Sequence, residues 1–259
     1  MLFTDHPARH PRAVLLSLLL SYALGLLLPS IAQAEEEAGP RLQTRSEVLL
    51  NLIDSQGASQ ERTINSRLRL DLEQHQWRQQ TRAQVLYTRS DGRTTKEAYN
   101  ASHQLNYQWA EDYYSLGFAR FQRDRFSKIS EREIDLLLGQ GYRVLRSEQT
   151  EWDLEIAAGA RYREPVNNPE VSSEYDPLAR AASRWQHQLS EDLRLEQDTA
   201  YDLSSDTNSW VLEQSLHVRA NRYFSLGLAY TWKRSEDRNQ NKIEYDRITS
   251  VNLVFSWHN

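Results

Sequence analysis

The chain has 259 residues, with 31 lysines and arginines against 36 aspartates and glutamates, and its formal net charge is −5 at pH 7. This mild acidity argues against nucleic acid as a partner, because binding to a polyanion favours a concentrated basic surface. The absence of cysteine excludes disulfides, a lipid on an N-terminal cysteine and thiolate metal sites.

The first 34 residues have the three parts of an export signal. Arg9 and Arg12 give a positive start, residues 13–29 are almost wholly apolar, and the small-residue stretch SIAQA follows at once. We expect cleavage after Ala34 and export through the general secretory route. The alternative is a retained transmembrane helix, but an apolar run of about 17 residues is at the low edge of what spans a bilayer.

The chain after residue 34 contains no stretch that approaches 18 consecutive apolar residues, so we expect no further transmembrane helix. Only helices and closed barrels can satisfy their backbone polar groups in hydrocarbon. If the mature chain spans a membrane, it therefore does so as a barrel. We expect a short periplasmic segment at residues 35–45 and a single barrel domain at residues 46–259.

Alternation with a period of two residues recurs along nearly the whole mature sequence, and it is typical of strands with one apolar face. For example, Trp152 and Leu154 share one face of a predicted strand, and Asp153 and Glu155 share the other. Twelve segments of this kind are predicted, at about residues 46–54, 61–72, 77–89, 97–109, 113–123, 131–145, 150–163, 178–189, 192–203, 210–220, 223–233 and 244–257.

These segments predict an all-β fold, a closed antiparallel up-and-down transmembrane barrel of about 12 strands. A strand tilted through the apolar slab takes about 9–11 residues, which most segments reach. An even number of strands brings both ends of the chain to one side of the membrane. Each odd-numbered predicted connection is longer than the even-numbered one after it, as expected for outer loops and periplasmic turns. We therefore expect the outer membrane of a Gram-negative bacterium.

Aromatic residues near the ends of the predicted strands form two candidate belts, because amphipathic rings are best placed at headgroup depth. The alternative is the general preference of strands for aromatics, but it would place them anywhere along a strand. The candidates beside the short connections or the C-terminus are Trp77, Trp109, Trp152, Phe224 and Trp257. The candidates beside the long connections are Tyr87, Tyr162, Trp232 and Tyr245.

A few residues fit the predicted outward face poorly. His103, Gln197, Thr199 and Gln214 fall on this face away from its ends, and a shifted register or a protein–protein contact would account for them. Arg120 and Arg247 also follow the outward parity of their strands. A bulge in the fifth strand would turn Arg120 inward, and Arg247 lies near a long predicted loop, where it could reach headgroups.

The predicted inward face carries many charges of both signs. A buried charge is stable only if it is ion-paired or hydrated. These side chains therefore either cross-link the interior or line a narrow water path. Strand number leaves both open, because about eight strands give a filled barrel and about sixteen an open channel. The candidate lumen-lining residues are Arg67, Arg69, Asp71, Asp153, Glu155, Arg161, Arg194, Glu196, Glu213 and Arg219.

We expect no catalytic, metal or cofactor site. Glu213 and His217 share the predicted inward face but are about 13 Å apart along a strand, too far to chelate one ion. No phosphate-binding glycine loop and no histidine pair at metal spacing occurs. The acidic predicted loops at residues 164–177 and 234–246 are candidates for divalent cations that bridge lipopolysaccharide, although solvated loops are the default.

Three stretches of the sequence resemble one known family. They are residues 107–145, residues 154–164 and an ending close to SVNLVFSW, and the family is the salt-induced outer membrane proteins, a YdiY-like family of unknown function. The likeness covers roughly residues 46–257. It implies an outer-membrane barrel and supplies no catalytic residues. Its motif residues in this chain are Asp124, Arg125, Phe126, Gly139, Gly141, Tyr142 and Gly159.

Two departures from the family pattern concern the ends of the barrel. The stretch DSQGASQE stands where the family has a glycine–asparagine pair, which leaves the bounds of the first hairpin open. His258 and Asn259 follow the final aromatic residue, where the family tends to end on it.

The sequence favours a non-enzymatic envelope protein that is structural or forms a narrow passive channel for small solutes or ions. An outer-membrane lipid hydrolase with an active site on the barrel wall and a soluble periplasmic β protein are the alternatives. The expected partners are outer-membrane lipids, lipopolysaccharide and, during biogenesis, the barrel-assembly machinery.

Overall fold

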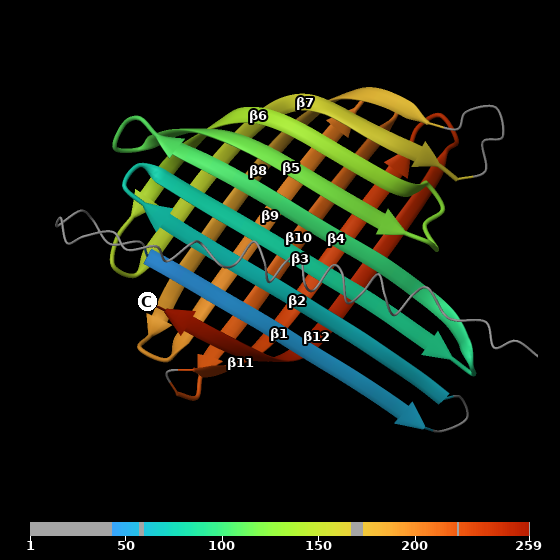
Figure 1. Ribbon diagram of the computed structural model, residues 1–259, viewed down its shortest axis with the longest axis horizontal. Coiled ribbons are helices and arrows are strands. Elements are labelled where there is room, and N and C mark those ends of the chain that lie inside the picture. The colour runs from blue at the N-terminus through green and yellow to red at the C-terminus, as the bar shows by residue number, and fades with distance from the viewer. Residues whose placement is uncertain (1–42, 57–59, 167–172, 222, 259) are drawn as a thin grey trace, which may run out of the picture. The chain divides into compact units, whose positions relative to one another are not determined.

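The computed structural model describes residues 43–56, 60–166, 173–221 and 223–258. The predicted signal peptide and most of the predicted periplasmic segment lie outside these residues. The described chain forms a closed antiparallel barrel of twelve strands (Figure 1), which confirms the predicted fold class. It contains no helix long and apolar enough to cross a membrane.

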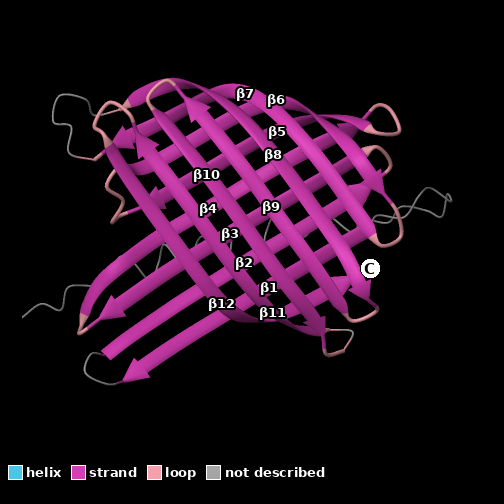
Figure 2. Ribbon diagram, turned by 180° about the vertical axis from the view of Figure 1, so that it is seen from behind, coloured by secondary structure: helices cyan, strands magenta, loops and turns pink. Residues whose placement is uncertain are grey.

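Each strand pairs with its neighbours in the sequence, and β12 closes the ring on β1 (Figure 2). The strands are β1 (Gln43–Gln56), β2 (Gln60–Gln74), β3 (Trp77–Ser90), β4 (Arg93–Gln108), β5 (Tyr113–Asp124), β6 (Ser130–Arg146), β7 (Thr150–Pro165), β8 (Glu174–Ser190), β9 (Leu193–Ser204), β10 (Thr207–Arg219), β11 (Phe224–Asp237) and β12 (Lys242–His258).

The barrel has two ends, which we name by what they carry. The terminal end carries Gln43 at the start of β1 and His258 at the end of β12. The loop end carries the connection between β7 and β8, which at residues 166–173 is the longest of the eleven.

The strands extend further than the sequence pattern predicted, and this corrects the predicted rhythm of connections. The β3–β4 connection is only Asp91 and Gly92, whose φ angles of 47° and 79° suit the tight type I′ turn. It is shorter than the β4–β5 connection at residues 109–112, so the prediction that each odd connection is the longer one is wrong. The ends of several strands are polar and lie beyond the apolar part of the strand, so their sequence is typical of loops although their backbone is paired in the sheet.

The predicted bulge in β5 is also wrong, because the whole strand has the opposite parity. Tyr114 and Leu116 are buried, Arg120 also points inward, and the pairing of β5 with β4 and β6 is continuous. The Tyr114 ring packs over Gly141 of β6, where an added Cβ would lie 2.1 Å from the ring. A glycine at this position makes room for an aromatic side chain inside the barrel, so apolar alternation in β5 marks the interior.

Three of the polar residues that fit the outward face poorly, His103, Gln197 and Gln214, are each hydrogen-bonded to a polar side chain on a neighbouring strand. The Thr81 hydroxyl lies 3.0 Å from His103 Nδ1, and Gln214 Nε2 donates to Gln197 Oε1 at 2.9 Å. All four lie in strands whose register is continuous at these pairs. A polar group in an apolar environment is tolerated when it is hydrogen-bonded, so these pairs account for the residues without a shifted register.

Candidate functional site: the interior of the barrel

The described residues line two large cavities in the interior. The main cavity, of about 380 Å³, reaches the loop end, where Lys96, Glu244 and Asp246 line it. The terminal cavity, of about 340 Å³, lies at the other end, where Arg45 and Arg143 line it. No described residue lines both cavities.

The boundary between the cavities falls between successive inward positions of the same strands. On β2, Arg69 lines the main cavity and Asp71 the terminal cavity. On β3, Gln80 lines the main cavity and Arg78 the terminal cavity. The side chains at this level therefore separate the two spaces, and we call them the partition. Its members are Arg45, Glu47, Arg69, Asp71, Gln80, Arg82, Arg184, Arg194, Glu196 and Asp198.

One half of the partition is a network between β1, β2 and β9. Arg69 Nη1 lies 3.0 Å from Glu196 Oε2, and Arg194 Nη2 lies 3.0 Å from Glu47 Oε1. Arg45 contacts both carboxylates, at 2.8 Å from Glu47 and 3.5 Å from Glu196. Because β2 and β9 are not neighbours in the ring, the Arg69–Glu196 pair crosses the interior.

The other half of the partition joins β3 to β8 and β9. Arg82 Nη1 lies 3.1 Å from Asp198 Oδ2, and Arg184 contacts the same carboxylate at 3.3 Å. Arg184 Nη1 also donates to Gln80 Oε1 at 2.5 Å. Strands β3 and β9 are six places apart in either direction round the ring, so the Arg82–Asp198 pair spans the interior.

The partition leaves hydrogen-bond donors that no described protein acceptor meets. Gln80 is 3% exposed, and its Nε2 has no hydrogen-bond partner in the described chain. The Nη2 atom of Arg82 is also buried without a hydrogen-bond partner there. Buried donors of this kind are normally matched by water or by a bound acceptor. The partition therefore presents unmatched donors in a site where arginines outnumber carboxylates.

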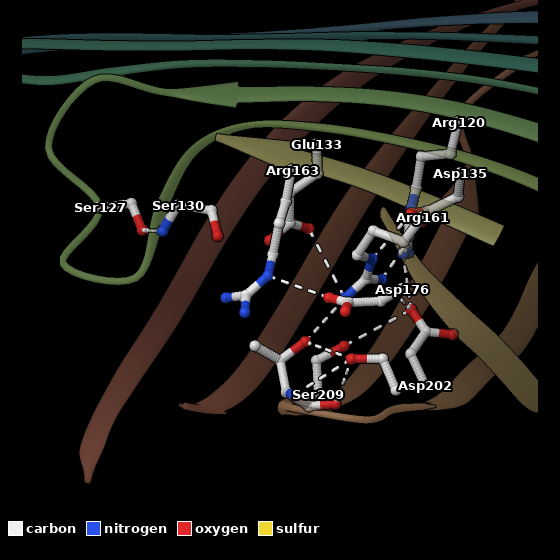
Figure 3. A network of polar contacts seen from close by, with 12 residues as sticks. Arg120, Ser127, Ser130, Glu133, Asp135, Arg161, Arg163, Asp176, Asp202 and Ser209 are labelled. Carbon is white, nitrogen blue, oxygen red and sulfur yellow. Dashed lines mark hydrogen bonds and ion pairs between the residues drawn. The ribbon is translucent and has the colours of Figure 1, made fainter. Parts of the chain in front are cut away.

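A second network fills the interior between β5 and β9 (Figure 3). Arg120 donates to Asp135 and Asp202, the latter at 2.6 Å, and Arg161 Nε donates to Asp135 Oδ1 at 2.8 Å. Arg180 donates to Asp202 at 2.9 Å. Both aspartates are fully buried. Charges removed from water in this way are stable only as a satisfied group, so this network cross-links the walls.

A third network surrounds Arg163 near the loop end. Its guanidinium contacts Glu174 at 2.5 Å, Asp176 at 3.0 Å, Asp206 at 3.2 Å and Asp237 at 3.4 Å. Oxygens of the first three carboxylates lie within 4.8 Å of one another, a donor set that suits a hard cation. The Arg163 guanidinium already lies among them and supplies the counter-charge, so the predicted divalent-cation role of the acidic loops stays a prediction.

One serine, one histidine and one acid meet inside the barrel, which the sequence did not indicate. His217 Nε2 lies 2.9 Å from Ser215 Oγ and 3.9 Å from Glu196 Oε2. In a nucleophilic triad the acid orients the opposite ring nitrogen from the one that faces the serine. Here both contacts involve Nε2, and Nδ1 has no partner in the described chain. This geometry does not match a nucleophilic triad.

A comparison with family models gives one match, to the family described as "Protein of unknown function, DUF481", over residues 50–257. The chain belongs to this family. No curated protein matches the chain significantly. The family membership agrees with a single barrel domain and adds no catalytic or ligand-binding residue.

Solved structures similar to this DUF481 chain are bacterial barrels. The translocator domain of the autotransporter NalP from Neisseria meningitidis is 8% identical, with 95% of this chain and 97% of that chain covered and a TM-score of 0.44. The KdgM porin is 8% identical, with coverages of 83% and 99% and a TM-score of 0.45. An outer membrane channel from Pseudomonas putida F1 is 10% identical, with coverages of 90% and 99% and a TM-score of 0.44. These likenesses concern the barrel alone.

Of the ten predicted lumen residues of the DUF481 chain, nine lie inside the barrel and Arg219 lies at its terminal end. Arg194 belongs to the partition, Asp71 lines the terminal cavity, and Asp153 is buried near Arg78. Arg219, at the end of β10, lies 3.0 Å from Asp192 in the β8–β9 turn and lines neither cavity. The residues that line the main cavity are Arg67, Arg69, Glu155, Arg161, Glu196 and Glu213.

The candidate belt residues of the DUF481 chain occupy the outer surface near both ends, and their role at a membrane interface stays a prediction. At the terminal end the Trp77 and Tyr107 rings are 4.7 Å apart, and Trp109 stacks on Tyr113 at 5.5 Å. The side chain of Trp257 lies outside the described residues. Further aromatic residues in ring contacts, which were not among the belt candidates, are Tyr107, Tyr113, Tyr142, Tyr175 and Phe255.

Proposed function

We propose that this chain is an outer-membrane barrel of a Gram-negative bacterium that forms a narrow, anion-preferring passage for small solutes. Support for the membrane location comes from the outward faces of β6 and β7. Leu136, Leu138 and Ile156 are 63%, 76% and 69% exposed, whereas the inward Asp135 and Arg161 of the same strands are buried. Large exposed aliphatic side chains over a charged interior suit a wall between lipid and water.

The observation that carries the proposed selectivity is the charge of the partition. It contains five arginines, which are Arg45, Arg69, Arg82, Arg184 and Arg194. Four carboxylates contact them, those of Glu47, Asp71, Glu196 and Asp198. The excess of one positive charge, together with the unmatched donors of Gln80 and Arg82, favours anions, as rings of arginine and lysine do in anion pores.

The same geometry limits the size of the solute. The cavities on either side of the partition share no lining residue, and ion pairs cross the space between them. A passing solute must move between arginine side chains that are held in ion pairs. We therefore propose a low conductance, restricted to small anions.

A charge swap across the barrel tests this proposal. In planar bilayers under a KCl gradient, Arg82→Glu is expected to shift the reversal potential toward cation selectivity, because it changes the partition from an excess of positive charge to an excess of negative charge. The double variant Arg82→Glu with Asp198→Arg restores both the pair and the net charge, so it should recover the parental value. Arg132→Glu, near the loop end and outside the partition, is the matched control.

A barrel whose partition never opens would instead be a structural envelope protein. Folded protein that stays silent in bilayers at all voltages would favour this second role. We also propose that the barrel is non-enzymatic, which the geometry at His217 supports. Hydrolysis of phospholipid vesicles by the purified chain, lost in Ser215→Ala, would contradict this.

The resemblance to salt-induced outer membrane proteins adds a regulatory proposal, that external salt raises production of the chain. Immunoblots of cells grown in low and high salt test it. Export through the general secretory route, cleavage after Ala34, and contacts with lipopolysaccharide and the assembly machinery also remain proposals. The N-terminal sequence of the protein in isolated outer membranes tests the first two.

A further inference from the structure

The seam between β1 and β12 is paired over only part of its length. The pairs run from Arg45–His258 to Leu50–Leu253, and no pair of described residues follows. Yet β1 continues to Gln56 and β12 begins at Lys242. Figures 1 and 2 show the two strands meeting near the C-terminus and running apart from there. Each strand stays paired along its other side, β1 with β2 and β12 with β11.

The unpaired part of β12 is held from across the mouth of the barrel. Asp246 lies 3.3 Å from Lys96 on β4. Glu244 accepts hydrogen bonds from the Ser127 hydroxyl at 3.0 Å and from the Lys128 backbone N–H at 3.4 Å, both in the β5–β6 connection. These contacts hold the start of β12 beside β4 and the β5–β6 connection.

The main cavity extends to this seam from the inside. Its lining includes Leu49 of β1 and Ile248 and Asn252 of β12, which are inward residues on the two separating strands. On the outer side, Val251 and Leu253 of β12 are 67% and 41% exposed. An opening at the seam would therefore connect an aliphatic outer surface with the cavity.

Hydrocarbon does not tolerate a free strand edge, because unpaired backbone groups there cost several kcal/mol each. Such an edge is tolerated where it lines a cavity that contains water. We propose that the seam is a lateral opening, through which a single-chain amphiphile passes between the bilayer and the main cavity. This inference does not depend on conduction through the partition.

The lining of the main cavity fits the proposed ligand class. Leu49, Phe118, Val211 and Ile248 offer apolar surface for an alkyl chain, and Lys233 adds a cation without an ion-pair partner among the described residues. A cavity of about 380 Å³ is within the range of about 300–1,000 Å³ that is usual for small-molecule sites. A molecule with one polar end and one apolar chain would match both kinds of surface.

Disulfide trapping tests the geometry of the seam without background, because the natural chain has no cysteine. Val48 faces Phe255 in the paired part, and Leu52 would face Val251 if the same register continued. In phosphatidylcholine vesicles we expect Val48→Cys with Phe255→Cys to oxidise, and Leu52→Cys with Val251→Cys to remain reduced. Complete oxidation of both pairs would show a closed seam and overturn the proposal.

Labelling from within the bilayer tests passage. Dodecyl maleimide dissolved in the vesicles should modify Ile248→Cys, inside the cavity, at the same rate as Val251→Cys on the lipid side. Ala182→Cys, which lines the same cavity from β8, should react more slowly. Modification of Ile248→Cys by a sulfonated, water-soluble maleimide but not by the dodecyl reagent would mean that the cavity opens only at its mouth, and would overturn the proposal. Heat-modifiable migration verifies that each variant is folded.

The two proposals fail separately. If the protein does not conduct in planar bilayers but dodecyl maleimide labels Ile248→Cys, the lateral opening is supported and the anion passage is contradicted. Anion conductance together with an unreactive Ile248→Cys would do the reverse.

Discussion

Arg82 on β3 lies 3.1 Å from Asp198 on β9, although the two strands stand at opposite places in the ring of twelve. An ion pair across the interior, instead of between neighbouring strands, reduces the passage to the space between long side chains. Strand number alone places this barrel between the filled barrels of about eight strands and the open channels of about sixteen. The ion pairs that cross this barrel show that its interior is neither fully filled nor an open channel, but two cavities separated by the partition.

Asp198→Asn is expected to increase anion preference, because it removes the carboxylate that Arg82 and Arg184 share. The reversal potential under a KCl gradient should move further in the anion direction, and the conductance should rise. Asp192→Asn, in the exposed β8–β9 turn, is the control and should leave both unchanged. A shift of Asp198→Asn in the cation direction would contradict the assignment of selectivity to the partition.

Asp135→Asn should destabilise the barrel strongly, because it leaves Arg120 and Arg161 buried with less counter-charge. Breaking a buried pair by removal of one partner typically costs about 3–5 kcal/mol. Urea unfolding in lipid vesicles, followed by tryptophan fluorescence, measures the loss. Glu131→Gln removes the half-exposed partner of Arg123 and should cost about 0–1 kcal/mol. Equal stability of the two variants would show that the buried network does not hold the walls together.

Gly141→Ala should displace the Tyr114 ring, because the added Cβ would overlap it. Overpacking of this kind typically costs about 1–3 kcal/mol. In Tyr114→Ala the ring is absent, so the further change Gly141→Ala should then cost little, and the two effects should not add. Gly117→Ala, whose Cβ would meet only Leu138 at 3.7 Å, is the matched control in urea unfolding. Additive losses in the double variant would argue against the contact.

Glu244→Gln combined with Asp246→Asn should release β12 from the mouth of the barrel. With its contacts to Lys96 and Ser127 weakened, the strand is free to pair with β1 along the rest of the seam. The Leu52→Cys with Val251→Cys pair should then form a disulfide that it does not form in the parent background. An unchanged yield would show that these contacts do not keep the seam apart.

The number and type of strands could be predicted from the sequence because an apolar outer face over a charged interior imposes an alternation that is visible without tertiary information. β7 shows this well, with Leu154 and Ile156 outside and Asp153 inside. The same logic failed for β5, where Tyr114 and Leu116 alternate with small residues and fill the interior. Apolar alternation identifies a strand, and the partner on the next strand decides which face is inside.

The partition could be predicted only in part. Parity identified Arg69, Arg194 and Glu196 as candidates for the lumen, but it gives no information about which strands approach each other across a barrel. Arg82 and Gln80 were not among the candidates, because β3 carries polar residues on both faces and its sequence has no clear alternation. The incomplete β1–β12 seam left no signal, because both strands keep their pattern beyond the last pair.

The reversal potential of the unmodified protein in a planar bilayer, with KCl more concentrated on one side, tests the central claim most directly. An arginine-rich partition predicts a small but measurable conductance whose reversal potential is shifted from zero toward the equilibrium potential of chloride. A reversal potential shifted toward the equilibrium potential of potassium, or folded protein that never conducts, would contradict this claim.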